Sequence, residues 1–308
     1  MSEPASAAQP REILISLVIP SFRSRATIAD TLQSALEQRI SQPLEVLLVD
    51  SSDDGTADWV RQRFPHVQVH HSPERLLPGA ARNRGAQLSR GKYLAFLDSD
   101  VIAPPAWLKR LLDLLKRHPR SRLAGAAVGC ANPESPAARV LYWIEFSEFL
   151  PGGPSGVRKA LSSSNLLIRE EDFERSGGFD EQFAMAEDLI FCQQLGGEMR
   201  LETSLSVSHR QREDWDEVRR HLKRLGFWSG RYRTTFRVAG SGLQKLPLLS
   251  FALLPIRLWR ILRRVHGGAS SAPQIKLADL PLLVGGLTVW CSGFYRGLQE
   301  GAVLKKRL

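Results

Sequence analysis

The chain has 308 residues, of which 43% are hydrophobic and 24% are charged, so it can bury a full core. Its net charge of +10 is uneven, because 17 of the 42 Lys and Arg residues but only 4 of the 32 Asp and Glu residues lie between Trp215 and Leu308. A nucleic-acid enzyme places its basic residues around the active cleft, so this pattern argues against a nucleic-acid partner. It favours an anionic membrane surface instead.

The N-terminal segment and the cysteines indicate where the chain is located. Residues 1–12 are polar and Ala-rich, without the basic region and apolar core of a signal peptide, and we expect a disordered lead. Cys130, Cys192 and Cys291 lie far apart and match no zinc or redox spacing. The simplest prediction is a reduced, cytosolic setting.

Strand and helix patterns alternate over the first hundred residues. Strands are predicted at 13–19, 44–49, 67–69 and 93–97, and helices at 27–37, 58–63 and 79–88. Such alternation predicts a parallel α/β sheet, whose ligands lie beyond the carboxyl ends of the strands. Pro20 ends the first predicted strand, and Asp50 and Asp98 follow the second and fourth. The sequence therefore predicts a binding site at this edge.

The middle of the chain continues the same architecture. We expect an amphipathic helix at 107–116, strands at 124–128, 161–168 and 201–207, and a helix at 189–195. The Gly- and Pro-rich stretch 151–156 predicts a mobile loop that could close over a substrate.

Asp98-Ser99-Asp100 directly follows the buried strand 93–97. Two carboxylates one residue apart suit Mg²⁺ or Mn²⁺, because these ions prefer oxygen ligands and leave positions for substrate phosphates. Such a cation would neutralise the charge on a departing nucleotide diphosphate. Asp also caps helices, and Pro104-Pro105 predicts a helix start nearby, so the triplet alone leaves both interpretations open.

The triplet is one of several short motifs spaced along the chain, which lie at 16–22, 47–56, 79–85, 91–100, 163–165, 177–180 and 187–188. In this order they resemble the family 2 glycosyltransferases, which have the GT-A fold. The resemblance covers about two thirds of the chain. It implies a GT-A fold, a nucleotide-diphosphate-sugar donor and an inverting, metal-dependent transfer.

The resemblance also implies roles on the donor side. The implied nucleotide-binding residues are Pro20, Asp50, Arg82 and Asp98, and the implied cation ligands are Asp100, Asp98 and His209. The alternatives are an Asx turn for Asp50, a solvated helix face for Arg82 and a structural role for His209. Ser51 stands where the family commonly has a second acid, so the role of Asp50 stays open.

Glu187 and Asp188 lie at a predicted helix start, where acids also complement the helix dipole. By resemblance this pair supplies the catalytic base that deprotonates an acceptor hydroxyl, and we favour Asp188. The family often has a further acid two residues later, where this chain has Ile190. Asp214 occupies the Arg position of the Gln-x-x-Arg-Trp box of processive synthases, so we do not predict processivity.

The C-terminal part combines basic residues with two uncharged apolar runs, 246–256 and 280–295. Each run is shorter than the roughly 20 residues of a spanning helix. Between them, Leu258, Ile261, Leu262 and Val265 share one face of a basic amphipathic pattern. We expect an in-plane or re-entrant association with the inner leaflet. The alternatives are packing on the core and a single spanning helix.

Together these patterns predict a lead at 1–12, a GT-A catalytic domain at 13–212 and a helical, membrane-associating region at 213–308. The predicted enzyme works at the cytoplasmic face of the membrane and transfers a sugar to a hydroxyl of a lipid-linked or cell-envelope glycan. One competing hypothesis is a nucleotide-sugar-binding scaffold without turnover. The other is a sugar-phosphate nucleotidyltransferase, which would require a Gly-rich loop that is missing after Pro20.

Overall fold

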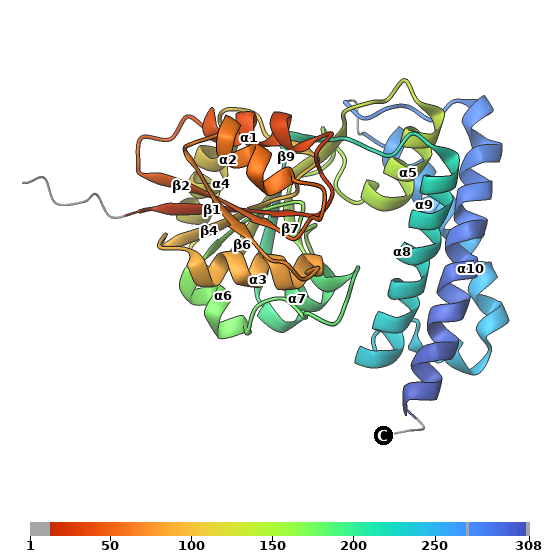
Figure 1. Cartoon of the computed structure of the whole chain (residues 1–308). Coiled ribbons are helices and arrows are strands. Elements are labelled where there is room, and N and C mark those ends of the chain that lie inside the picture. The colour runs from red at the N-terminus through yellow and green to blue at the C-terminus, as the bar shows by residue number, and fades with distance from the viewer. Residues whose placement is uncertain (1–12, 269–270, 306–308) are drawn as a thin grey trace, which may run out of the picture.

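A computed structural model describes residues 13–268 and 271–305, with side chains placed through Glu300. The predicted disordered lead, residues 1–12, lies outside these ranges. Figure 1 shows a twisted sheet with helices on both faces, and a layer of long helices beside it.

The described residues form a nine-stranded sheet in the order β3-β2-β1-β4-β8-β6-β9-β5, with β7 paired to β9. The first four strands are parallel, as the alternating pattern predicts. The sheet as a whole is mixed, because β8 runs antiparallel to both β4 and β6. The strands are β1 Ile15–Ser21, β2 Leu44–Asp50, β3 Val67–His71, β4 Tyr93–Leu97, β5 Val101–Ile102, β6 Ser121–Cys130, β7 Gly156–Arg158, β8 Asn165–Arg169 and β9 Glu198–His209.

Helices cover both faces because side chains of a strand alternate between them. Leu17 and Ile19 of β1 belong to the core under α1 (Ile28–Leu36), α2 (Thr56–Arg63) and α4 (Trp107–Arg117), whereas Val18 belongs to the opposite core. That second core lies under α3 (Pro78–Leu88), α6 (Glu170–Ser176) and α7 (Glu187–Leu195) (Figure 1).

Two expectations about the elements were wrong, and one helix was not predicted. β1 continues through Pro20 to Ser21, paired there with β2 alone, because its pairing with β4 stops at Val18. On that unpaired side a backbone N–H is not required, so Pro20 is tolerated as it is on an edge strand. β8 begins at Asn165 rather than at 161. The sequence patterns also missed α5 (Pro136–Phe146), which is buried on almost every side and so lacks an apolar stripe.

The helical layer consists of α5, α8 (Trp215–Phe236), α9 (Leu253–His266) and α10 (Leu280–Lys305). Between α8 and α10 the chain adds the short 3₁₀ helices η1 (Ser241–Lys245), η2 (Pro247–Ala252) and η3 (Leu277–Asp279). Because α5 comes from the middle of the chain, this layer is not built from the C-terminal region alone. The domain boundary at residue 212 stays a prediction. Asp214, the departure from the processive box, caps α8 by accepting a hydrogen bond from the Glu217 N–H at 2.9 Å.

α8 and α10 run side by side in the same direction (Figure 1), and glycines let their backbones touch. A Cβ at Gly226 or Gly230 would overlap the carbonyl oxygen of Trp290 or Phe294. Gly293 and Gly297 meet the backbone of α8 in the same way. The two small-xxx-small patterns therefore determine how closely the helices pack.

Replacing Gly226 with Ala should destabilise the protein by about 1–3 kcal/mol, because the new methyl group overlaps backbone that cannot move freely. The matched control is Gly285 of α10, where nothing lies within 4 Å of an added Cβ. Gly285→Ala should be neutral or stabilise by up to about 1 kcal/mol through helix propensity. Thermal unfolding measures both variants, and equal stability of the two would contradict this packing.

One helical segment among the described residues, Leu277–Glu300, is long and apolar enough to cross a membrane by length and composition. Its mean hydropathy is 1.4, and 44% of its most apolar window is buried inside the protein. The sequence patterns treated the uncharged run 280–295 as too short to span a membrane; in the structure this run lies within the longer helix α10. A mostly buried helix of a soluble protein has the same properties, so the segment is weak evidence of a membrane span.

Candidate active site

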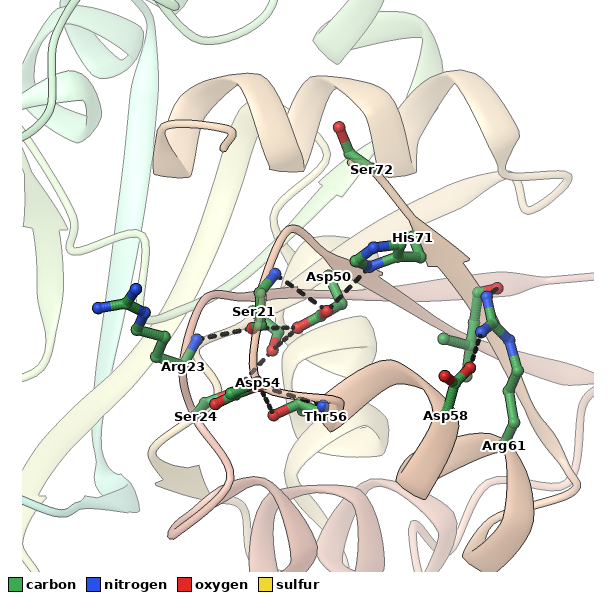
Figure 2. A network of polar contacts seen from close by, with 12 residues as sticks. Ser21, Arg23, Ser24, Asp50, Asp54, Thr56, Asp58, Arg61, His71 and Ser72 are labelled. Carbon is green, nitrogen blue, oxygen red and sulfur yellow. Dashed lines mark hydrogen bonds and ion pairs between the residues drawn. The ribbon is translucent and has the colours of Figure 1, made fainter. Parts of the chain in front are cut away.

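Asp50 lies at the end of β2, fully buried in a network of polar contacts. Its Oδ1 accepts hydrogen bonds from the hydroxyls of Ser21 and Ser52 at 2.6 and 2.7 Å. Its Oδ2 accepts one from the Ser52 N–H at 3.1 Å and lies 3.2 Å from His71 Nδ1. Figure 2 shows how Ser21 and His71 approach this carboxylate from β1 and β3.

The Asx turn that the sequence left open is therefore present. The hydrogen bonds of Asp50 connect the loop after β1 with the loop after β2. A nucleotide base could hydrogen-bond to Asp50 only by sharing a carboxylate oxygen that already has a partner. Pro20 lines the cavity beside this network.

Arg82 is buried and bridges two acids that are far apart in the sequence. Its Nη2 lies 2.5 Å from Asp98 Oδ1, and its Nη1 lies 2.8 Å from Glu187 Oε1. Arg82 lies one turn into α3, and it is buried rather than on the solvated helix face that the sequence left as the alternative. A guanidinium with two charge-assisted bonds fixes both carboxylates, so Arg82 joins the end of β4 to the start of α7.

Asp98, Asp100 and His209 gather at the edge of the sheet, with one ligand atom of each within 4.8 Å of the others. His209 Nε2 lies 3.6 Å from Asp100 Oδ1 because β5 and β9 pair, with Val101 opposite His209. His209 Nδ1 lies 3.2 Å from the Arg210 carbonyl oxygen and 3.0 Å from Gln211 Nε2, so its protonation depends on the tautomer. In the tautomer that donates to the Arg210 carbonyl, Nε2 is free to bind a cation.

The residues fit a divalent cation. Burial raises the pKa of Asp100, with the neighbouring Asp98 adding to the shift, whereas the charge of His209 opposes it. Asp98 and Asp100 are partly exposed, and two carboxylates so close together repel each other; a cation bound between them would relieve that repulsion. Two carboxylates plus an imidazole can hold Mg²⁺ or Mn²⁺ and leave positions open for phosphate oxygens.

Glu187 and Asp188 face different partners at the start of α7. Glu187 is held by Arg82 and by the Ser163 hydroxyl, which donates a hydrogen bond at 3.4 Å. The Asp188 carboxylate, in contrast, accepts a hydrogen bond from the Leu189 N–H alone among the described residues. Burial, followed by the charge of Glu187, raises the pKa of Asp188 to about 7. Such a carboxylate can accept a proton near neutral pH.

The backbone before this pair is strained. Ala186 has φ of +67°, a left-handed conformation that costs an L-residue free energy and concentrates at functional sites. It turns the chain sharply into α7. Two residues further on, Ile190 is fully buried, so the position where the family often has an acid belongs to the core here.

A cavity of about 560 Å³ connects these groups. Pro20, Arg82, Asp98, Asp100, Glu187, Asp188 and His209 all line it. Asp50 does not, because its own network encloses it. The opposite wall comes from α5, α8 and α9, which the sequence patterns did not connect to the site.

The residues of this wall include Glu145 of α5 and His221 of α8, whose Nε2 lies 3.2 Å from a Glu145 carboxylate oxygen. The charge of His221 keeps the pKa of Glu145 below its usual value although burial opposes this. Only tertiary packing brings α5 and α8 together, so no sequence signal marked this pair in advance.

A mixed α/β sheet that gathers carboxylates at the carboxyl ends of its parallel strands has the GT-A architecture of nucleotide-sugar transferases. Within that class, a model of glycosyl transferase family 2 matches residues 16–173, and the chain belongs to that family. The resemblance seen in the sequence is thus confirmed.

Curated relatives agree with this assignment. The pre-mycofactocin glycosyltransferase of Mycobacterium tuberculosis is 28% identical over 245 residues, which span 75% of this chain and 49% of that protein. The succinoglycan biosynthesis protein ExoO of Rhizobium meliloti is 30% identical over 220 residues, which span 65% of this chain and 61% of that protein. The chain thus spans about half of the first relative's length and three fifths of the second's.

Among solved structures, residues 1–349 of S. aureus TarS superpose with a TM-score of 0.53 at 17% identity, covering 95% of this chain and 92% of that one. The same protein in complex with UDP-GlcNAc gives a TM-score of 0.52 at 18% identity. At such low identity the likeness shows the fold alone. It confirms the predicted GT-A fold and extends over the helical layer.

Proposed function

We propose that this protein is an inverting glycosyltransferase that moves a sugar from a nucleotide diphosphate to a hydroxyl of an acceptor. The observation that carries the proposal is the Arg82 bridge. Arg82 forms ion pairs with Asp98, at the predicted donor site, and with Glu187, beside the predicted base. All three side chains line the same cavity. UDP-sugars are the first donors to test, since a structure with this fold binds UDP-GlcNAc.

Asp188 acts as the base in this proposal. The acceptor hydroxyl gives its proton to the Asp188 carboxylate, and its oxygen forms a bond to the anomeric carbon of the sugar. The bond from that carbon to the diphosphate oxygen breaks, and the electron pair leaves with the nucleoside diphosphate. Direct displacement inverts the anomeric centre. Glu187 is a positioning residue, because its carboxylate is held by Arg82.

Asp98, Asp100 and His209 would hold the cation, which stabilises the leaving diphosphate as a Lewis acid when it is bound. Arg82 positions Asp98 for this task. Asp50 orders the loops on which the nucleoside rests through its contacts with Ser21 and Ser52.

The test is to incubate the purified protein with a panel of nucleotide sugars, with Mn²⁺ or with EDTA, and to measure the nucleoside diphosphate released. Release that requires Mn²⁺ identifies the donor and supports the transferase. Nucleotide binding without any release would favour a scaffold. Release of a sugar phosphate and a nucleoside triphosphate that requires added pyrophosphate would favour a nucleotidyltransferase.

We further propose that the acceptor is lipid-linked or part of a cell-envelope glycan, and that the enzyme acts at the cytoplasmic face of the membrane. The support is a set of exposed apolar side chains on a strongly basic part of the chain. Those on η1, η2 and α9 and at their ends are Leu246, Leu248, Leu249, Phe251, Ile256 and Trp259.

We expect the protein to bind vesicles of phosphatidylglycerol more strongly than vesicles of phosphatidylcholine, because basic side chains add attraction to anionic lipids. The double variant Leu248→Ser, Trp259→Ser should sediment with these vesicles at least several-fold less. Trp215→Ser, which changes an exposed tryptophan of α8, is the control. Unchanged sedimentation of the double variant would exclude this surface as the membrane contact.

A further inference from the structure

The wall of the cavity that faces the helical layer is rich in arginines without acidic partners. The two glutamates near it are already paired, Glu145 with His221 at 3.2 Å and Glu148 with Arg264 at 2.7 Å. Within the described ranges, no ion pair involves the other arginines of this wall. These are Arg212 and Arg224, followed by Arg233, Arg257 and Arg260.

Arg257 is the most enclosed of these arginines. Its Nε is buried and has no hydrogen-bond partner in the described part of the chain. Its Nη2 donates to the Ile144 carbonyl oxygen at 3.1 Å, and its guanidinium lies 3.9 Å from the centre of the Trp290 ring. Burial, followed by the charge of Arg233, lowers the pKa of Arg257 to about 10.

Arg233 of α8 also lines the cavity, and it lies near enough to Arg257 for its charge to lower the pKa of Arg257. Its Nη1 donates to the Ser229 carbonyl oxygen at 3.0 Å, and its guanidinium lies 5.3 Å from the centre of the Phe294 ring. A guanidinium has five N–H donors, and within the described residues each of Arg233 and Arg257 uses one of them in a hydrogen bond to a protein acceptor. Two desolvated charges of the same sign destabilise the folded protein unless an anion joins them.

We propose that Arg233 and Arg257 bind a phosphate or diphosphate group of the acceptor, so that the acceptor is a phosphorylated glycan or glycolipid. This inference rests on the proposed transferase function. Guanidinium groups match phosphate oxygens in paired, charge-assisted hydrogen bonds. The donor diphosphate is assigned to the cation at Asp98, Asp100 and His209, whereas Arg233 and Arg257 rest on aromatic rings of α10.

The source of the phosphate can be a lipid or a water-soluble glycan. α9 carries Arg257 into the cavity wall while its neighbours Ile256 and Trp259 stay 45% and 57% exposed. A diphosphate attached to an apolar chain could therefore place its charge on the arginines and its chain along the exposed face of α9. The two probes below separate these sources.

The experiment titrates the full chain with inorganic pyrophosphate and with farnesyl diphosphate by calorimetry. EDTA is present, so that no cation supports binding at the donor site. Arg257→Met and Arg233→Met keep an apolar stem and remove the charge. We expect each to weaken binding of both probes by about tenfold or more. Arg263→Met is the control, because Arg263 is exposed on α9 and does not line the cavity.

Tighter binding of farnesyl diphosphate than of pyrophosphate identifies a lipid-linked acceptor, and equal affinities identify a water-soluble one. Binding of UDP in the presence of Mn²⁺ should be the same in Arg257→Met as in the unchanged protein. A parallel loss of UDP binding would overturn the proposal, because the pair would then serve the donor. Probe affinities that neither variant changes would overturn it too.

The thermal stability of the variant distinguishes a role of Arg257 in anion binding from a purely structural role. Arg257→Met removes a buried charge without an acidic partner, so its thermal midpoint should equal or exceed that of the unchanged protein. A lower midpoint together with intact probe binding would show that Arg257 only supports the fold. If no donor is turned over but both variants lose probe binding, the transferase proposal fails and the anion site stands.

Discussion

Replacing Asp188 with Asn should lower turnover by about 10²–10⁴-fold while binding of the donor stays the same, because the variant cannot accept the acceptor proton. In the unchanged protein the pKa of Asp188 is raised to about 7. The base is active when it is deprotonated, so turnover should fall as the pH drops through about 7 and level off above about 8. Steady-state rates between pH 5 and 9 measure this profile.

The same variant gives a stability readout without substrate or metal. A carboxyl group whose pKa is raised on folding destabilises the folded state once the pH exceeds its unfolded value, and the loss grows until the folded pKa is passed. Asp188→Asn should therefore raise the thermal midpoint at pH 8 and have little effect below pH 4. Glu187→Gln is the matched comparison, since Glu187 is paired with Arg82. If Glu187→Gln rather than Asp188→Asn lowered turnover and removed its pH dependence, the base would be Glu187.

Asp100→Asn should remove metal-dependent turnover, with a loss of about 10³-fold or more. The reason is that a bound cation stabilises the negative charge on the leaving diphosphate by several kcal/mol in the transition state. Binding of Mn²⁺ to the free protein gives a second readout that does not depend on activity. His209→Ala should weaken Mn²⁺ binding less than Asp100→Asn does, because it removes a neutral ligand rather than a charged one.

The control for this prediction is Asp113→Asn. Asp113 is an exposed acid of α4 whose carboxylate lies 2.7 Å from Lys109 Nζ, and it does not line the cavity. It should keep both turnover and Mn²⁺ binding. An Asp100→Asn variant that bound Mn²⁺ with unchanged affinity would show that the cation sits elsewhere.

Local patterns were sufficient for the strands with continuous apolar or β-branched runs and for the amphipathic helix α4. β2 and β3 begin where the sequence patterns place them, and the apolar stripe of α4 predicts that helix to within one residue. α5 was missed because it is buried between the sheet and α10, so its apolar residues show no helical period. Its start could have been recognised from Ser135, whose hydroxyl accepts a hydrogen bond from the Ala138 N–H at 3.3 Å before Pro136.

The sequence by itself determined the family and the acids at the ends of the strands, because strand-to-loop transitions and short acidic motifs are local features. The tertiary structure alone decided which of these groups meet. His209 reaches Asp100 only because β5 pairs with β9, and Arg82 reaches Glu187 only because α3 and α7 cover the same face. The unpaired arginines of α8 and α9 are ordinary charged residues in the sequence. They line the cavity because α8 and α9 both pack against α10, and such long-range packing leaves no mark in any short window of sequence.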